Sequence, residues 1–157
     1  MKKFRGVGAI ITSESTGKVL TVLRSPIESH PNTWTFAGGK VELEETEIDA
    51  LKRELEEELQ LTKIKKIIPL HRYQSRSKDF VYDTFIVLVN KEFVPTLNEE
   101  NIGYAWTTVK TLPGPLHPKT RQMISSARLV EKFNNFYSWI DKKNGSRDHT
   151  ISEEAGI

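Results

Sequence analysis

Hydrophobic and polar residues alternate along the chain in a way that predicts several short strands and two longer helices. Apolar runs rich in Val, Ile and Phe, bounded by Ser, Thr, Gly and Pro, predict strands over 4–12, 18–24, 64–73, 80–90 and 103–109. Residues 33–37 form a shorter extended piece. The turn-forming cluster at 13–17 joins the first two strands, which we expect to form an antiparallel hairpin.

Two segments have the spacing of amphipathic helices. The first covers residues 46–61, where Thr46 followed by Asp49 resembles a capping box. The second covers residues 119–142, where apolar residues recur at intervals of three and four. They are Met123, Ile124, Ala127, Val130, Phe133, Tyr137 and Ile140. Residues 143–157 are polar and lack this period, so the pattern predicts one domain over 1–142 and a mobile tail.

Length and composition narrow the class of protein. The chain of 157 residues suits a single domain. It contains no cysteine, which excludes a disulfide scaffold, a thiol nucleophile and a cysteine-ligated zinc site. No apolar run approaches the roughly 20 residues of a membrane helix, and no apolar segment of a signal peptide follows the first residues. We therefore expect a cytoplasmic protein with no membrane partner.

The net charge of +2 conceals an uneven distribution of charge. Residues 38–60 contain nine acidic and three basic side chains, a balance of −6, which leaves +8 for the remainder of the chain. An α-helix advances about 100° per residue, so Glu54, Glu57 and Glu58 share an arc about 100° wide. Two explanations stay open at this point: a solvated acidic face with Lys52 and Arg53 as counterions, or oxygen ligands for a divalent cation.

The spacing around these glutamates resembles the Nudix box, whose pattern is Gly-x5-Glu-x7-Arg-Glu-U-x-Glu-Glu-x-Gly-U, with U a bulky apolar residue. Eight of its nine fixed positions match in the segment from Gly39 to Leu61. The matching residues are Gly39, Glu45, Arg53, Glu54, Leu55, Glu57, Glu58 and Leu61. Gln60 replaces the second glycine of the box. That glycine ends the helix and often has a positive φ, so glutamine at this position costs about 1 kcal/mol. Ala37 stands where many members have proline.

The resemblance implies an α+β fold, a Nudix-like α/β/α sandwich with a central mixed β-sheet. The metal-binding helix would lie near 46–61 and a long C-terminal helix near 119–142. It implies a hydrolase that cleaves the pyrophosphate linkage of a nucleoside diphosphate joined to another group, by water and with Mg²⁺, or Mn²⁺ as a substitute. Such substrates include (d)NTPs, ADP-ribose, dinucleoside polyphosphates and nucleotide sugars.

The resemblance also assigns roles to residues. Glu54, Glu57 and Glu58 would bind the metal, with the backbone carbonyl of Gly39 or of its neighbour Gly38 as a further ligand. Arg53 would orient these carboxylates, paired with Glu45. The general base is Glu54 in our first interpretation. Alternatively it is Glu57 or Glu100, since in some members a loop glutamate serves, and either Glu99 or Glu100 could complete the metal shell or remain solvated.

The basic remainder of the chain supplies candidates for substrate binding. Lys40 is the strongest because it lies inside the box, and the others are Arg24, Arg72, Arg76 and Lys78. Aromatic candidates for stacking on a base are Trp34, Phe36, Tyr73 and Tyr82, each with a place in the core as the alternative. His30, His71 and His117 lack ligand spacing, and we interpret them as incidental.

Three alternatives to a nucleotide hydrolase remain. One is a catalytically silent Nudix-fold module that binds a nucleotide, although such a module could discard the carboxylates that are all present here. Another is an RNA 5′-end pyrophosphohydrolase, so nucleic acid stays open as a partner but is not favoured. The third is a charged-helix interaction protein, which does not explain Gly39 and Glu45 in register. We expect a monomer or a homodimer.

Overall fold

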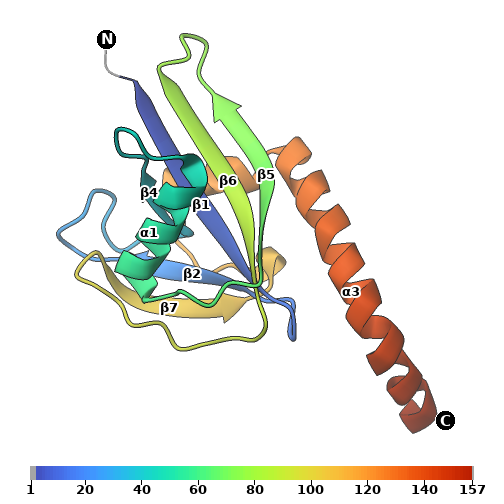
Figure 1. Ribbon diagram of the computed structural model, residues 1–157. Coiled ribbons are helices and arrows are strands. Elements are labelled where there is room, and N and C mark those ends of the chain that lie inside the picture. The colour runs from blue at the N-terminus through green and yellow to red at the C-terminus, as the bar shows by residue number, and fades with distance from the viewer. Residues whose placement is uncertain (1–2, 157) are drawn as a thin grey trace.

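The computed structural model describes the backbone of residues 3–156 and the side chains of residues 3–140 and 142. Figure 1 shows the elements in chain order. They are β1 (Phe4–Ser13), β2 (Val19–Arg24), β3 (Trp34–Thr35), β4 (Ala37–Lys40), α1 (Glu47–Leu59), β5 (Lys66–Gln74), β6 (Phe80–Val89), β7 (Asn101–Thr107), a 3-10 turn (Val109–Thr111), α2 (Pro118–Ile124) and α3 (Ala127–Gly156). The predicted strands are confirmed, and the extended piece at 33–37 corresponds to β3 and the start of β4.

The strands form one mixed sheet. Its order is β3-β2-β1-β6-β5, with β4 also beside β1 and β7 also beside β2. β1 and β6 run parallel, and the other pairs are antiparallel. The predicted hairpin of β1 and β2 is antiparallel, but its register is short (Ile11 with Leu20, Thr12 with Val19), because β2 then pairs along its length with β7. This second pairing brings the loop before β7 to the end of β2.

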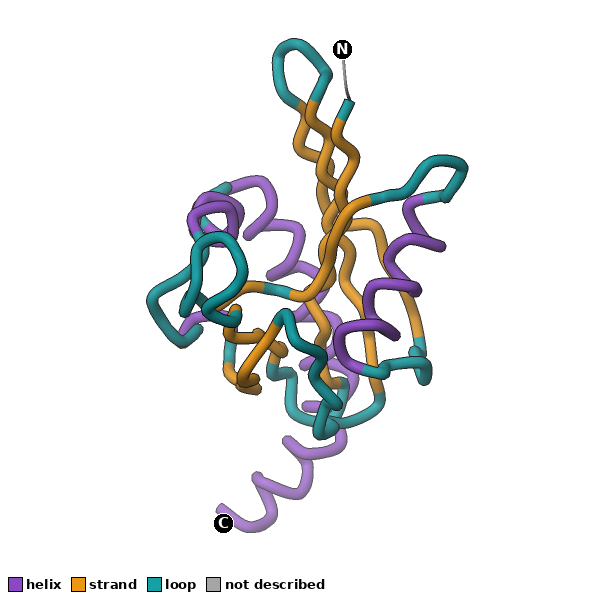
Figure 2. Tube along the Cα trace, turned by 90° about the vertical axis from the view of Figure 1, so that its left-hand side faces the viewer, coloured by secondary structure: helices purple, strands orange, loops and turns teal. Residues whose placement is uncertain are grey.

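Helices cover both faces of the sheet, as Figure 2 shows. On one face, α1 packs through Leu51, Leu55 and Leu59 against alternate residues of β1 such as Val7 and Ile11. On the other face, α3 packs against a second core cluster that includes Ile10, Ile86, Leu129 and Phe133. The expected α/β/α arrangement is therefore confirmed.

The helix that the apolar spacing predicted over 119–142 consists of two helices, α2 and α3. Two serines separate them: Ser125 Oγ donates to the Arg121 carbonyl at 2.7 Å, and Ser126 Oγ accepts from the Leu129 amide at 3.4 Å. Serine side chains compete in this way with helical hydrogen bonds. Ala127, which we placed in the apolar stripe, is consequently exposed.

Helix α3 continues to Gly156, well beyond the predicted end at residue 142. The side chains from residue 143 onward lie outside the described part, so the mobility of residues 143–157 stays a prediction. No helix among the described residues is long and apolar enough to span a membrane.

Both ends of α1 follow the sequence prediction. Thr46 caps the helix, and its hydroxyl accepts a hydrogen bond from the Asp49 amide at 3.1 Å. Gln60 ends it in the left-handed region, with φ 53° and ψ 35°. Glutamine thus adopts the conformation for which the box has glycine, and its amide still donates to the Glu56 carbonyl at 2.9 Å. The substitution leaves the helix end in place and costs backbone strain.

Candidate metal centre and active site

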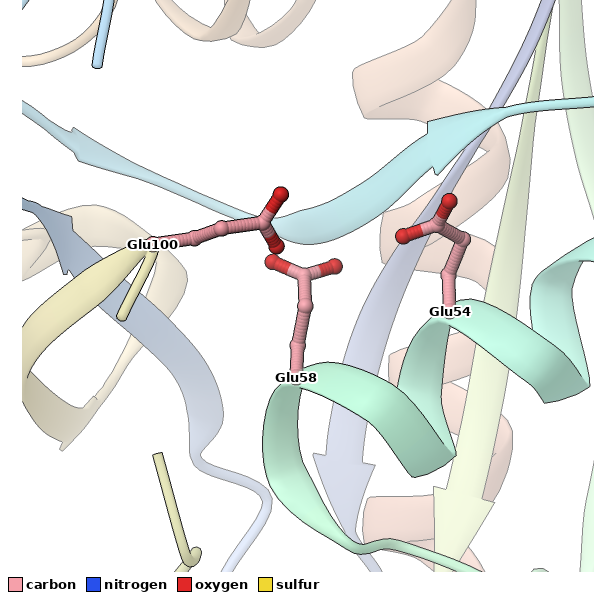
Figure 3. Close-up of side chains that lie close together, drawn as sticks. All are labelled: Glu54, Glu58 and Glu100. Carbon is pink, nitrogen blue, oxygen red and sulfur yellow. The ribbon is translucent and has the colours of Figure 1, made fainter. Parts of the chain in front are cut away.

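Three carboxylates from two separate segments meet beside α1. Glu54 and Glu58 lie one turn apart on the helix, and Glu100 lies directly before β7. One carboxylate oxygen of each lies within 4.8 Å of one oxygen of each of the others. Figure 3 shows the Glu58 and Glu100 carboxylates pointing toward each other, with Glu54 alongside. We call this set the three-glutamate cluster.

Glu58 is the most deeply buried member of the cluster. It is 5% exposed, because it lies next to the apolar stripe that fixes α1 on the sheet. Its two oxygens accept hydrogen bonds from the Gly38 amide and from the Asn101 side-chain amide, each at 3.1 Å. Burial outweighs these bonds and, with the charges of Glu100 and Glu54, raises the pKa of Glu58 to about 8.

Glu54 lies against the backbone of β4. Its side chain is 12% exposed, and a Cβ at Gly39 would collide with its carboxylate. A Cβ at Gly38 would collide with the Val7 carbonyl of the neighbouring strand. Both glycines therefore allow close packing against the backbone of β4. Gly38 lets β4 pair with β1, and Gly39 leaves room for the Glu54 carboxylate over the strand. Burial also raises the pKa of Glu54.

Arg53 holds the acidic loop and the helix together. It pairs with both oxygens of Glu45 at 2.8 and 2.9 Å, as expected, and donates to the Lys40 carbonyl at 2.9 Å. Its remaining nitrogen reaches Glu54 at 3.0 Å and Glu57 at 3.3 Å. The paired guanidinium lowers the pKa of Glu45 to about 2. Arg53 thus neutralises Glu45 and gives only partial neutralisation to the cluster.

Glu57 lies apart from the other two helix glutamates. Its side chain is 55% exposed, it pairs with Arg53, and it is not a member of the three-glutamate cluster. Its neighbour Glu56 is exposed, as expected. Residues within the predicted 100° arc thus divide between an inward group and one that faces solvent.

The cluster has the donor set that a hard divalent cation requires. Three carboxylates from two segments share a small volume, two of them largely buried, and only Glu54 contacts an arginine among the described residues. Holding three such charges together is costly without a cation. Mg²⁺ and Mn²⁺ take carboxylate oxygens, so the residues fit such an ion.

Comparison with known proteins agrees with the fold and the site. The NUDIX domain family matches residues 2–127. The chain belongs to the Nudix family. It is by class a nucleotide pyrophosphohydrolase, and the resemblance drawn from the box is confirmed.

Two characterised relatives are similar to this Nudix chain over different lengths. An 8-oxo-dGTP diphosphatase from Haemophilus influenzae is 29% identical over 136 residues, which cover 86% of this chain and 98% of the relative. A CTP pyrophosphohydrolase from Escherichia coli is 48% identical over 59 residues. That match covers 38% of this chain and 42% of the relative, so it spans less than half of that enzyme.

Solved structures share the fold. A MutT NUDIX hydrolase from Burkholderia pseudomallei superposes with a TM-score of 0.62 at 23% identity, covering 84% of this chain and 98% of the other. The ORF135 protein of E. coli gives a TM-score of 0.57 at 27% identity, covering 82% and 94% of the two chains. The central sheet and its helices are thus those of Nudix proteins.

The basic residues proposed for substrate binding are scattered in the Nudix chain. Arg72 pairs with Asp83 through two hydrogen bonds of 2.7 and 3.0 Å, near Glu47 at the start of α1. Arg76 is exposed in the turn between β5 and β6. Lys40 is exposed at the end of β4, and Arg24 ends β2 beside Asn101. Their roles toward substrate stay predictions.

The aromatic candidates occupy different environments. Trp34 is half-buried in β3, and its carbonyl accepts from the His117 amide at 2.8 Å. Tyr82 lies over Gly6 and Gly8, where any Cβ would collide with its ring, and stacks on Phe80. Burial and the charges of Glu58 and Glu54 raise the pKa of its hydroxyl.

Sequence reasoning missed Asn101, which donates to Glu58 and is 5% exposed. It directly follows Glu100, so β7 begins with a residue that ties the loop glutamate to the helix glutamate. The predicted strand began only at residue 103, so Asn101 was taken as a loop residue and no signal in the sequence specified its partner.

Proposed function

We propose that this Nudix chain hydrolyses a pyrophosphate linkage in a nucleoside triphosphate, with Mg²⁺ or Mn²⁺ held by the three-glutamate cluster. The convergence of Glu54, Glu58 and Glu100 carries this proposal. A bound divalent cation would supply charge neutralisation of the phosphates and a lowered pKa for bound water. The names of the two relatives, which act on CTP and on 8-oxo-dGTP, make these two nucleotides the first substrates to test.

The residues divide the work according to their environment. Glu58 and Glu100, which point toward each other, are the inner ligands, and the Gly39 carbonyl is a further candidate. Glu54 is our candidate general base, since burial raises the pKa of its carboxyl and so makes it a stronger proton acceptor. In the reaction, the oxygen of water bonds to phosphorus, the bridging P–O bond breaks, and Glu54 takes the proton of the water.

Glu57 has a separate role in this proposal. Its exposed carboxylate is available to a second cation at the solvent side, where it would exchange its bond with Arg53 for the metal. Arg53 positions Glu45, Glu54 and the Lys40 carbonyl, and so orients the carboxylates rather than binding the metal.

A substrate panel tests this function. Phosphate release after coupling to phosphatase would be measured with Mg²⁺ and with EDTA, on CTP, 8-oxo-dGTP, other (d)NTPs, ADP-ribose, dinucleoside polyphosphates, nucleotide sugars and 5′-triphosphate RNA. We expect Mg²⁺-dependent turnover of a nucleoside triphosphate. Loss of turnover in Glu54→Gln, with Glu56→Gln as the matched control on the exposed side of the helix, would support the assigned base. Absence of turnover on the whole panel would refute the proposal.

A further inference from the structure

One member of the three-glutamate cluster comes from a long loop. The connection between β6 and β7 spans residues 90–100, and Glu100 is its last residue. Ordering each residue of such a loop costs conformational entropy, so a loop moves unless other contacts hold it. A metal ligand on a loop is most effective where supporting residues already hold it in the productive geometry. The contacts of this loop therefore bear on how tightly a cation binds.

The middle of the loop is anchored to the body of the domain. The Thr96 amide donates to the Leu59 carbonyl in the last turn of α1 at 3.2 Å, and Leu97 packs against the core cluster that contains Leu59. The Phe93 carbonyl accepts from Trp106 Nε1 at 2.9 Å. These contacts fix the path of the loop beside α1, but they do not orient the carboxylates of the cluster.

Two asparagines flank the two glutamates that end the loop. Asn98 Oδ1 accepts from the Glu100 amide at 3.1 Å, and Asn98 Nδ2 donates to the Glu100 carboxylate at 3.4 Å. The first bond is the turn that an asparagine side chain forms with the backbone two residues further on. Glu100 joins the cluster, whereas Glu99 is exposed. Asn98 thus orients the ligand that the loop contributes.

Asn101, directly after the loop, joins it to the helix. Its Nδ2 donates to Glu58 Oε1 at 3.1 Å, and the other Glu58 oxygen accepts from the Gly38 amide at 3.1 Å. Both donors are neutral, so they orient the carboxylate without neutralising its charge. A carboxylate oxygen that accepts one hydrogen bond keeps acceptor capacity for a cation. Glu58 is thereby held in the direction of Glu100, as Figure 3 shows.

An irregular register in the sheet accompanies this placement of Asn101. Leu23 of β2 pairs with Gly103 of β7. The next pair is Arg24 with Asn101, and the register passes over Ile102, which is exposed. Such a bulge re-aims neighbouring side chains and is common next to active sites. Asn101 consequently lies buried against the helix glutamate at the point where β7 begins.

We propose that Asn98 and Asn101 are positioning residues of the metal centre. They hold the loop ligand and the helix ligand in the metal-binding geometry before the cation arrives, and they do not contact the cation. Without the Asn101 donor, the Glu58 carboxylate turns more freely and the loop loses a bond to α1, so the cation has to order both. The inference rests on the proposed function, which places the cation at the three-glutamate cluster, but cation affinity is measurable without substrate.

The first test measures the affinity of metal-free protein for Mn²⁺ through the electron paramagnetic resonance signal of free Mn²⁺. Asn101→Leu keeps nearly the size of the side chain and removes the donor. We expect the dissociation constant for Mn²⁺ to rise about 10- to 100-fold, as for other partners that orient metal ligands.

Thr12→Val is the matched control for this variant. Thr12 is also buried, and its hydroxyl donates within β1 to the Ile10 carbonyl at 3.1 Å, so the control removes a buried hydrogen bond that does not reach the cluster. Its dissociation constant should stay within about twofold of the wild-type value. An unchanged constant in folded Asn101→Leu, or an equal rise in Thr12→Val, would overturn the proposal.

A second variant decides the question if Asn101→Leu does not fold. Asn98 is only half-buried, and Asn98→Ala removes both of its side-chain bonds to Glu100. The dissociation constant for Mn²⁺ should rise about tenfold. Asn90→Ala makes the same substitution at an exposed position of the same loop and should leave the constant unchanged. Equal constants in the two alanine variants would contradict the positioning role.

Kinetics separates positioning from substrate binding. On the substrate that the panel identifies, Asn101→Leu should need about 10- to 100-fold more Mg²⁺ for half-maximal activity. At saturating Mg²⁺, KM for the nucleotide should stay within about twofold, because the asparagine acts on the cation site and not on the nucleotide. A raised nucleotide KM with wild-type Mg²⁺ dependence would contradict the proposal.

The metal measurements and the substrate panel can fail separately. If the panel shows no turnover while Mn²⁺ affinity falls selectively in the asparagine variants, the positioning role stands and the proposed hydrolysis fails. If turnover occurs while both asparagine variants bind Mn²⁺ like the wild type, the hydrolase stands and the positioning role fails.

Discussion

The acidic side chains around α1 fall into two groups that differ in neutralisation. At the start of the helix, Glu47 pairs with Arg5, and nearby Asp83 pairs with Arg72. Further along the helix, the three carboxylates of the cluster converge, and among the described residues only Glu54 of the three contacts a guanidinium, that of Arg53. The first group has the partners that a stable fold provides. The second lacks them, which is the signature of a site that obtains its positive charge from a ligand.

The largest expected effect comes from the buried member of the second group. Glu58→Gln removes a charged ligand while keeping the size of the side chain, so kcat should fall at least about 10²-fold, since metal coordination supplies several kcal/mol. Asp83→Asn, in the neutralised group, should leave kcat within a few-fold. The measurement is steady-state kinetics at saturating Mg²⁺. Comparable losses in the two variants would remove the distinction between the groups.

A smaller effect is expected at Arg53, which pairs with Glu45 and also contacts Glu54 of the cluster. Arg53→Lys retains a positive charge but loses the two-pronged bond to Glu45 and the bond to the Lys40 carbonyl. Since Arg53 acts on the metal ligands from outside, we expect Mg²⁺ affinity or kcat to fall about 10- to 100-fold. Raising the Mg²⁺ concentration should recover part of the activity. A variant with wild-type Mg²⁺ dependence would show that Arg53 is only structural.

The pH dependence of cation binding sharpens the comparison further. Burial raises the pKa of Glu58 to about 8, so this carboxyl holds a proton at pH 7 in the metal-free fold. In the unfolded chain the same carboxyl is ionised at pH 7. The group therefore stabilises the metal-free fold fully below about pH 4.5, and this contribution is lost as pH rises through about 8. Mg²⁺ must displace the proton, so its affinity should rise up to about tenfold per pH unit between pH 6 and 8.

Calorimetry of Mg²⁺ binding at pH 7 in two buffers with different ionisation enthalpies measures the released proton directly. Glu58→Gln is the matched control and should release less. Proton-free binding by the wild type at pH 7 would contradict the assigned state of Glu58.

The smallest effect concerns the end of α1. Gln60→Gly relieves the left-handed backbone at φ 53°, so it should stabilise the fold by about 1 kcal/mol and raise Tm by about 2–4 °C. Because Gln60 contributes no group to the cluster, kcat should not change. Thermal unfolding followed by circular dichroism measures the first quantity. A lower Tm would show that the glutamine side chain contributes packing that outweighs the strain.

Local features of the sequence predicted much of this architecture. The Thr46 cap follows from short-range spacing. The resemblance to the Nudix box implied the left-handed residue at 60 and the pairing of Arg53 with Glu45, and the structure contains all three features. The division between Glu57 and Glu58 did not follow, because a 100° arc does not specify which edge the sheet buries. The break at residues 125 and 126 was hidden because the apolar period continues across two serines whose hydroxyls bond to the backbone.

Contacts between distant segments were beyond the reach of sequence reasoning. Glu99 and Glu100 were both candidates to complete the metal shell, and the start of β7 directs Glu100 into the cluster while Glu99 is exposed. His30 and His117 have no motif in common, and only the packing of the β2–β3 loop against the start of α2 brings their rings together. Residue type indicated the chemistry of these groups, whereas tertiary structure determined which of them meet.

The most direct test of the central claim is a crystal structure with Mn²⁺, located by its anomalous scattering. The account predicts a peak bonded to carboxylate oxygens of Glu58 and Glu100, with Glu54 in the same site, and no peak at Glu47 or Asp83, whose charges arginines already neutralise. A protein that binds Mn²⁺ only outside the three-glutamate cluster would contradict the account.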